Sequence, residues 1–156
     1  MANVQHSALT GSDLHEPKGV ASATAGKVYI SNGSGSGAWT SAGEIITGYI
    51  EDVSTAEVVH VPMPFAGTIS KVITVLEGAI SNDDATITVK NASAASMGTL
   101  VIDHDKAPSG SAAGDVNTLS PSSNNTVSAN TFITVETNGN SHTARKLRFA
   151  VVLDKS

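Results

Sequence analysis

The densest group of residues that could bind a metal is Asp103-His104-Asp105. Carboxylate oxygens and imidazole nitrogens are common ligands of divalent cations. In a strand, however, neighbouring side chains point to opposite faces, so at most Asp103 and Asp105 could converge on one ion. Pro108 and Gly110 follow closely, which is typical of a solvated loop. We therefore expect no metal site and no cofactor.

The motifs of nucleophilic and phosphate chemistry are also missing from the sequence. No serine lies in a Gly-x-Ser-x-Gly sequence, and the glycine run at 33–37 does not have the spacing of a phosphate-binding loop. The chain has no cysteine, which excludes a thiolate nucleophile and a thiolate zinc site. A pair of carboxylates from distant strands could hydrolyse a glycoside, but the aromatic residues that usually hold a sugar are few. We predict that the protein is not an enzyme.

Composition excludes two classes of partner. The chain of 156 residues has a net charge of −5, and its basic residues gather only at Arg145, Lys146 and Arg148, which we predict to be a solvated strand edge. Nucleic-acid binding through phosphates needs clustered Lys and Arg, so no nucleic-acid partner is expected. No apolar run approaches the roughly 18 residues of a membrane span, and the N-terminal residues lack the pattern of a signal peptide. We expect a soluble, unprocessed protein without a membrane partner.

The elements that could position functional residues divide the chain into segments 1–43 and 44–156. The first is small, polar and glycine-rich, and its only strand pattern is a short hairpin with strands at 27–31 and 38–40. An isolated two-stranded hairpin is marginally stable in water, so this one needs a surface to lie on. The low hydrophobic content of residues 3–25 is typical of a segment that becomes ordered on a partner. We interpret segment 1–43 as an attachment arm.

Segment 44–156 consists of β-branched runs separated by Gly, Asn, Asp, Ser and Pro, without a helical run of three turns. This pattern predicts an all-β fold, an antiparallel β-sandwich of the jelly-roll kind. In the run at 84–91, Ile87 and Val89 share one face, opposite Thr86, Thr88 and Lys90. The predicted strands are 45–53, 57–61 (ended by Pro62), 68–76, 84–91, 99–102, 116–119, 130–137 and 146–153. Residues 82–84 are predicted to form a turn.

The predicted core of this head domain is thin. Val, Ile and Leu fill it, with Phe65, Phe132 and Phe149 as the only phenylalanines. A domain of about 110 residues buries a limited fraction of its surface alone. Contact between identical subunits would bury more, and a rotationally symmetric oligomer is the simplest way to obtain it.

Residues 6–39 contain a recognisable order of motifs. They are a His-x-x-Leu sequence from His6 to Leu9, the string Leu-His-Glu-Pro-Lys-Gly at 14–19, a Val-Tyr strand and a Gly-Ser-Gly-x-Trp turn that ends at Trp39. This order resembles the N-terminal segment of a group of tailed-bacteriophage virion proteins, which includes capsid decoration (cement) and head-fibre proteins. The sequences at 66–69, 84–89 and 113–116 are similar to the β-sandwich heads of such proteins.

The resemblance implies an accessory protein on the outer surface of a phage capsid. Its partners would be the major capsid protein and further copies of itself, as a homotrimer, and its arm would bind the assembled shell. The capsid-binding residues would be His6, Leu9, Leu14, His15, Glu16, Pro17 and Lys18. Two alternatives stay open: the arm could pack on the head of its own trimer, and the head could be a fibre-type adhesin that binds a host-surface glycan.

Overall fold

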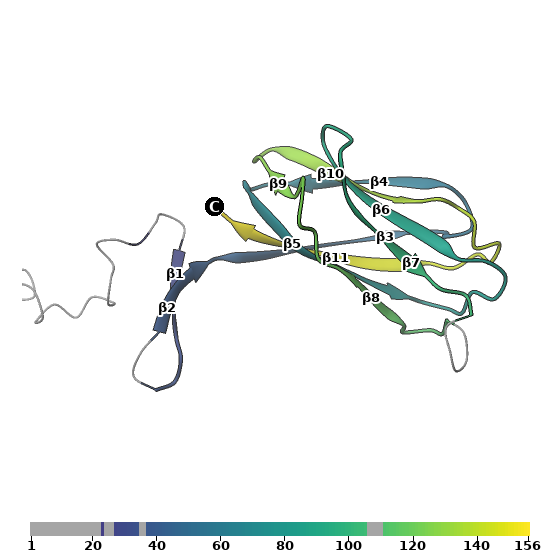
Figure 1. Cartoon of the computed structure of the whole chain (residues 1–156), viewed down its shortest axis with the longest axis horizontal. Coiled ribbons are helices and arrows are strands. Elements are labelled where there is room, and N and C mark those ends of the chain that lie inside the picture. Colours follow the sequence, from purple (N-terminus) through teal and green to yellow (C-terminus); the bar gives the residue numbers. More distant parts are fainter. Residues whose placement is uncertain (1–22, 24–26, 35–36, 106–110) are drawn as a thin grey trace, which may run out of the picture. The chain divides into compact units, whose positions relative to one another are not determined.

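A computed structural model describes residue 23 and residues 27–34, 37–105 and 111–156 of the chain. The chain divides into two compact units, Met1–Ser41 and Ala42–Ser156. Every regular element in the described residues is a β-strand (Figure 1). None of these residues forms a helix that could span a membrane.

The described part of the first unit is a hairpin of β1 (Lys27–Ser31) and β2 (Gly37–Ser41), which pair antiparallel. The sequence predicted this hairpin, although β2 is one residue longer at each end than expected. Tyr29 and Trp39 lie opposite each other, with ring centroids 5.4 Å apart in an edge-to-face arrangement. A Cβ at Gly37 would lie 2.7 Å from the Tyr29 ring, so glycine is required beside this ring.

The second unit is a sandwich of two antiparallel sheets (Figure 1). One sheet has the order β4-β10-β6-β7 and the other has the order β3-β11-β5-β8, with the short β9 also paired to β5. The strands are β3 (Gly43–Ile50), β4 (Glu57–Met63), β5 (Gly67–Leu76), β6 (Ala85–Asn91), β7 (Ser96–Ile102), β8 (Val116–Leu119), β9 (Thr126–Val127), β10 (Thr131–Thr137) and β11 (Leu147–Lys155).

The connections give this sandwich its jelly-roll topology. The chain changes sheet between β3 and β4, β4 and β5, β5 and β6, β7 and β8, β9 and β10, and β10 and β11. Apart from the short β9, this leaves four strands in each sheet, which is the jelly-roll architecture. The predicted fold class, an all-β antiparallel sandwich of the jelly-roll kind, is confirmed.

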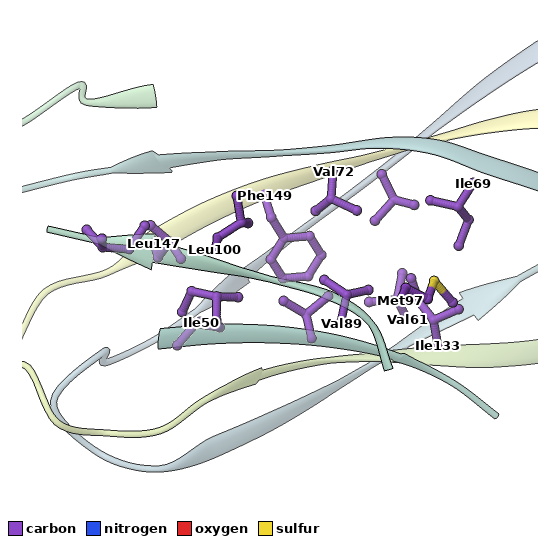
Figure 2. Close-up of a cluster of buried hydrophobic side chains, with 14 of the residues drawn as sticks. Ile50, Val61, Ile69, Val72, Val89, Met97, Leu100, Ile133, Leu147 and Phe149 are labelled. Carbon is purple, nitrogen blue, oxygen red and sulfur yellow. The ribbon is translucent and has the colours of Figure 1, made fainter. Parts of the chain in front are cut away.

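The core lies between the sheets and is built from the inward positions of each strand. Ile87 and Val89 of β6 are buried as predicted, and Leu147, Phe149, Val151 and Leu153 alternate inward along β11. Figure 2 shows the Phe149 ring among aliphatic side chains contributed by both sheets. Aliphatic residues and two methionines supply most of this core, and Phe149 is the one aromatic residue among its buried members.

Gly48 makes room for that ring. Gly48 of β3 pairs with Phe149 of β11, and a Cβ at Gly48 would lie 2.4 Å from the ring atom Cζ. Real Cβ atoms do not approach other atoms so closely. The glycine that interrupts the apolar run of β3 therefore accommodates the largest side chain of the core.

Two other phenylalanines do not enter the core, contrary to the prediction. Phe132 is 38% exposed because it lies at an outward position of β10, between inward Ile133 and the preceding turn. Phe65 is 44% exposed in the loop between β4 and β5, where Lys155 Nζ lies 4.0 Å from its ring centre. Phe132 is exposed because of its position in the strand and Phe65 because it lies in a loop, so hydrophobicity alone does not decide burial.

Pro62 was wrongly predicted to end its strand. β4 continues to Met63, and Pro62 lies opposite Phe132 of β10. β4 is an edge strand of its sheet, so a residue without a backbone N–H is tolerated where that group would face away from the neighbouring strand. Strand β9 was not predicted, because two residues are too few to give an alternating pattern.

Candidate functional site

The seven predicted capsid-binding residues lie outside the described residues. They are His6, Leu9, Leu14, His15, Glu16, Pro17 and Lys18. The described surface that follows them in the chain is the β1–β2 hairpin.

The hairpin is apolar on both faces. One face holds the Tyr29 and Trp39 rings, and the other carries Val28 and Ile30, which are 44% and 57% exposed. Its turn is stabilised locally, since the Asn32 side-chain oxygen accepts a hydrogen bond of 2.9 Å from the backbone N–H of Ser34. A two-stranded hairpin of this length is marginal in water. Its exposed valine and isoleucine are therefore suited to contact with another protein surface.

The two sheets of the sandwich differ in their outward faces. On the β4-β10-β6-β7 sheet, Lys90 Nζ lies 2.5 Å from Glu136 Oε2, and Thr134 donates a hydrogen bond of 2.7 Å to the other oxygen of Glu136. The hydrogen bond from Lys90 is the main reason that the pKa of Glu136 is below its usual value. This polar row is what a water-facing sheet surface normally carries.

The outward face of the five-stranded sheet carries apolar residues on β3, β11, β5 and β8, together with exposed Lys71 and Arg148. Ile45 and Tyr49 of β3 are 66% and 50% exposed, and Val116 of β8 is 56% exposed. Between these strands the face is hollowed by a depression of about 540 Å³, which lies over Thr47 and Ala150. We call this surface the outer apolar face; its members are Ile45, Thr47, Tyr49, Ile73, Val75, Val116, Ala150 and Val152.

Cations at one end of the outer apolar face are neutralised within the chain. Lys146 Nζ lies 3.0 Å from Glu51 Oε2 and 4.6 Å from the centre of the Tyr49 ring. Arg148, which lies beside Tyr49 in the next strand, donates a hydrogen bond to Glu77. Two residues of the basic cluster are thus paired with carboxylates where β11 begins, and the third, Arg145, donates hydrogen bonds to the carbonyl oxygens of Ala79 and Ala144.

A second, polar hollow lies where β6 begins and β7 ends. Its volume is about 490 Å³, and it is lined by Asp83, Asp84, Thr86, His104, Asn138, Asn140 and His142. Asp84 Oδ1 accepts a hydrogen bond of 2.9 Å from the backbone N–H of His104 and lies 2.7 Å from His104 Nδ1. These contacts lower the pKa of Asp84, the backbone bond contributing most, while the hydrogen bond to Asp84 raises the pKa of His104.

This hollow corrects one sequence interpretation. We expected only Asp103 and Asp105 to converge, but one ligand atom from each of Asp84, Asp103 and His104 lies within 4.8 Å of the others. Asp84 joins the group because β6 and β7 are antiparallel neighbours and Ala85 pairs with Ile102. Asp84 Oδ1 already interacts with both the backbone N–H and the Nδ1 atom of His104. These contacts connect the start of β6 with the end of β7.

Asp103 and Asp105 do lie close together. The backbone N–H of Asp105 donates a hydrogen bond of 3.0 Å to Asp103 Oδ1. A hydrogen bond between the two carboxyl groups is the main reason that the pKa of Asp105 is raised. Protonation of one partner is how two neighbouring carboxylates usually relieve their repulsion.

Comparison with known proteins gives no family. No family model matches the chain, and no curated protein matches it. A chain in the structure of infectious bursal disease virus Gx strain is similar over 81% of this chain and 41% of its own length, with 12% identity and a TM-score of 0.25. This chain thus spans less than half of that one, and a likeness at this level assigns no function.

The sequence predicted neither the outer apolar face nor the polar hollow as a site. We expected Val, Ile and Leu to fill the core, yet along residues 45–50 and 73–76 apolar residues lie on the outward face as well. That signal was present in the sequence, because Ile45 and Ile46 are adjacent and must point to opposite faces.

Proposed function

We propose that the protein is a non-enzymatic structural component of a tailed-phage virion. It binds the outer surface of the assembled capsid through its N-terminal arm and stabilises the shell, as a homotrimer. The observation that carries this proposal is the hairpin, which belongs to a separate small unit, exposes Val28 and Ile30, and contains the last of the motifs that resemble phage attachment arms.

The physical logic of such an arm supports the proposal. A segment with few apolar residues loses conformational freedom only when it binds, so it can follow the seams between capsid subunits. In the string at 14–19, Leu14 offers an apolar anchor, and Pro17 favours an extended backbone at Glu16. Three arms on one trimer raise the overall affinity without stronger individual contacts.

Binding to undecorated capsids tests the arm. We expect Leu9→Asp and Leu14→Asp in the full chain to weaken binding by at least about tenfold, because each places a charge in an apolar contact. Ser7→Asp and Ser12→Asp add the same charge to the same segment and serve as matched controls. Binding at full strength by the leucine variants, or by a chain truncated to 42–156, would refute the proposal.

Stabilisation of the shell requires its own measurement. Capsids saturated with the protein should release DNA at a higher temperature than undecorated capsids, since a ligand that binds only the intact shell stabilises it. If saturated capsids release DNA at the same temperature as undecorated ones, the protein binds the shell but does not stabilise it, and the stabilising part of the proposal is wrong.

The polar hollow supports a second candidate function, a fibre-type adhesin. Its Asn, Asp and His side chains could form hydrogen bonds with the hydroxyl groups of a host-surface glycan, although no Phe, Tyr or Trp is among its lining residues. A glycan array probed with the full chain distinguishes the two functions. Binding of a glycan that is lost in Asn140→Ala, with capsid attachment intact, would favour the adhesin.

A further inference from the structure

The chain contains two Asn-Gly sequences, Asn32-Gly33 in the hairpin turn and Asn138-Gly139 directly after β10. Asparagine is one of the chemically labile residues. The backbone nitrogen of the residue that follows it can attack the carbon of the side-chain amide, and glycine favours this attack because no side chain of its own stands in the way. The surroundings of each sequence then decide whether the attack can take place.

The two sequences share their local geometry, and both asparagines are exposed. Asn32 Oδ1 accepts a hydrogen bond of 2.9 Å from the backbone N–H of Ser34, and Asn138 Oδ1 accepts one of 3.2 Å from the backbone N–H of Asn140. The two glycines have φ of 74° and 75°. In both, the glycine N–H donates to the hydroxyl group of the residue before the asparagine, over 3.2 and 3.3 Å. Local geometry therefore does not distinguish the two asparagines.

Tertiary contacts do distinguish them. Asn138 is held on β6 at two points, since its side-chain oxygen accepts a hydrogen bond of 3.0 Å from the Thr86 backbone N–H and its own backbone N–H donates one of 3.0 Å to the Thr86 carbonyl oxygen. Gly139 packs tightly on the β3–β4 loop, where a Cβ would lie 2.3 Å from the backbone nitrogen of Ala56. At Gly33 a Cβ would meet nothing within 4 Å. The peptide group before Gly33 therefore has room to turn, and the one before Gly139 does not.

We propose that Asn32-Gly33 is a site of spontaneous modification, at which asparagine becomes aspartate and isoaspartate, and that isoaspartate opens the β1–β2 hairpin. Asn138-Gly139 stays intact in the folded chain. This inference goes beyond the proposed function and does not depend on it.

The reaction needs only water as a co-reactant. The Gly33 nitrogen loses its proton to a base and attacks Cγ of Asn32, so that a C–N bond forms while the bond to the amide nitrogen breaks. That nitrogen takes a proton from water and leaves as ammonia. Water then opens the five-membered succinimide: cleavage at Cγ gives aspartate, and cleavage at the main-chain carbonyl carbon gives isoaspartate. The hydrogen bond from Ser34 favours the attack, because it stabilises the negative charge that develops on Oδ1.

Isoaspartate changes the main chain of the turn. It leads the backbone through Cβ and Cγ of residue 32, which adds one carbon atom between β1 and β2. The turn sets the register of a hairpin, and this register is constrained, because a Cβ at Gly37 would lie 2.7 Å from the Tyr29 ring. A slip of one residue would bring a side chain such as that of Ala38 to this place. Since an isolated hairpin is marginally stable, the longer turn should separate its strands.

Peptide mapping of the full chain tests the modification site. The protein is incubated at mildly alkaline pH, which favours loss of the glycine N–H proton, and mass spectrometry with electron-transfer fragmentation locates aspartate and isoaspartate. We expect Asn32 to react at least about tenfold faster than Asn138, because reaction at Asn138 has to wait for local opening of the sheet. Equal rates at the two asparagines would overturn the proposal.

The unfolded chain is the control for the effect of tertiary contacts. In guanidinium chloride neither Asn-Gly sequence keeps its folded surroundings, so the two rates should agree to within about threefold. An excess at Asn32 as large as that in the folded chain would show that the neighbouring sequence, and not the packing around Asn138, sets the difference, and would refute the structural argument.

The fluorescence of Trp39 tests the opening of the hairpin. Trp39 is the only tryptophan of the chain, and its ring lies 5.4 Å from that of Tyr29 on the opposite strand. We expect the emission to shift to longer wavelength as isoaspartate accumulates, with the same rate constant as the loss of Asn32, because separation of the strands exposes the ring to water. Accumulation of isoaspartate without this shift would show that the hairpin tolerates the longer turn, and that part of the inference would be wrong.

Freshly prepared Asn32→Asp is the matched control for charge. It carries the charge of the modified chain on an unaltered main chain, and its carboxylate can accept the same hydrogen bond from Ser34. We expect its emission to equal that of fresh wild type. A full shift in fresh Asn32→Asp would assign the opening to charge and refute the role of isoaspartate.

Discussion

The close approach of Gly48 to Phe149 leads to a quantitative prediction. Gly48→Ala would place a methyl group 2.4 Å from the Phe149 ring, which is only 3% exposed and is enclosed by both sheets. The ring would have to move by about 1 Å in a close-packed interior, and overpacking of this kind costs roughly 1–3 kcal/mol. The new methyl group points inward, so the outer apolar face and the native mass should not change.

A second substitution should relieve that cost. Phe149→Leu alone leaves a small cavity and should cost on the order of 1–2 kcal/mol, below the roughly 3–5 kcal/mol typical of Phe to Ala. In Gly48→Ala/Phe149→Leu the methyl group occupies part of that space. The double variant should therefore lose at least about 1 kcal/mol less than the sum of the two single variants.

Urea unfolding followed by far-UV circular dichroism measures these free energies, at one protein concentration because association contributes to stability. Gly43→Ala is the matched control: it lies in the same strand, and a Cβ there would meet nothing within 4 Å. We expect that variant to stay within about 0.5 kcal/mol of wild type. If Gly48→Ala is as stable as Gly43→Ala, or if the single effects simply add, the steric argument is wrong.

Three other residues give sharp expectations. Thr74→Val should raise the unfolding free energy by about 1 kcal/mol, because among the described residues its fully buried hydroxyl has no hydrogen-bond partner; lower stability would contradict this. Gly139→Ala should lower the melting temperature more than Gly114→Ala. Both glycines have positive φ, but only at Gly139 would a Cβ lie 2.3 Å from a backbone nitrogen of the β3–β4 loop, and equal melting temperatures would contradict this. Asp84→Asn should lower the pKa of His104 toward its ordinary 6.5, which an NMR titration measures, and an unchanged value would exclude the contact. The pKa of His104 is raised in the folded state, so its contribution to stability is complete below its ordinary pKa of about 6.5 and is lost as the pH rises through the folded pKa. The pKa of Asp84 is lowered, so its contribution is complete above its ordinary pKa of 3.8 and is lost as the pH falls through the folded pKa.

Much of the strand content could be predicted, because side-chain alternation is a local property. Along β6 and β11 every second residue is apolar, and those residues are the buried ones. β8 has the bounds that the sequence predicted, Val116–Leu119. Strand ends were less accurate: the run predicted at 45–53 ends at Ile50, because the backbone N–H of Val53 donates to Arg145 instead of to a strand partner.

Pairing could not be predicted, because an alternating pattern does not identify the neighbouring strand. β10 lies between β4 and β6, which brings Glu136 to Lys90 across 46 residues. The same dependence on pairing explains the polar hollow. Asp84 was predicted to lie in a turn, and only the pairing of β6 with β7 brings it to His104.

β3 illustrates the division between local pattern and tertiary contact. The amino-acid sequence alone establishes that the run from Ile45 to Ile50 is a strand with apolar residues on both faces. The tertiary structure decides which face is the core: Phe149 on the neighbouring strand fits only against Gly48, so Ile46 and Ile50 turn inward and Ile45 and Tyr49 remain outside. The physical reason is that hydrophobicity is a property of a residue, whereas burial depends on the shape of what lies opposite it.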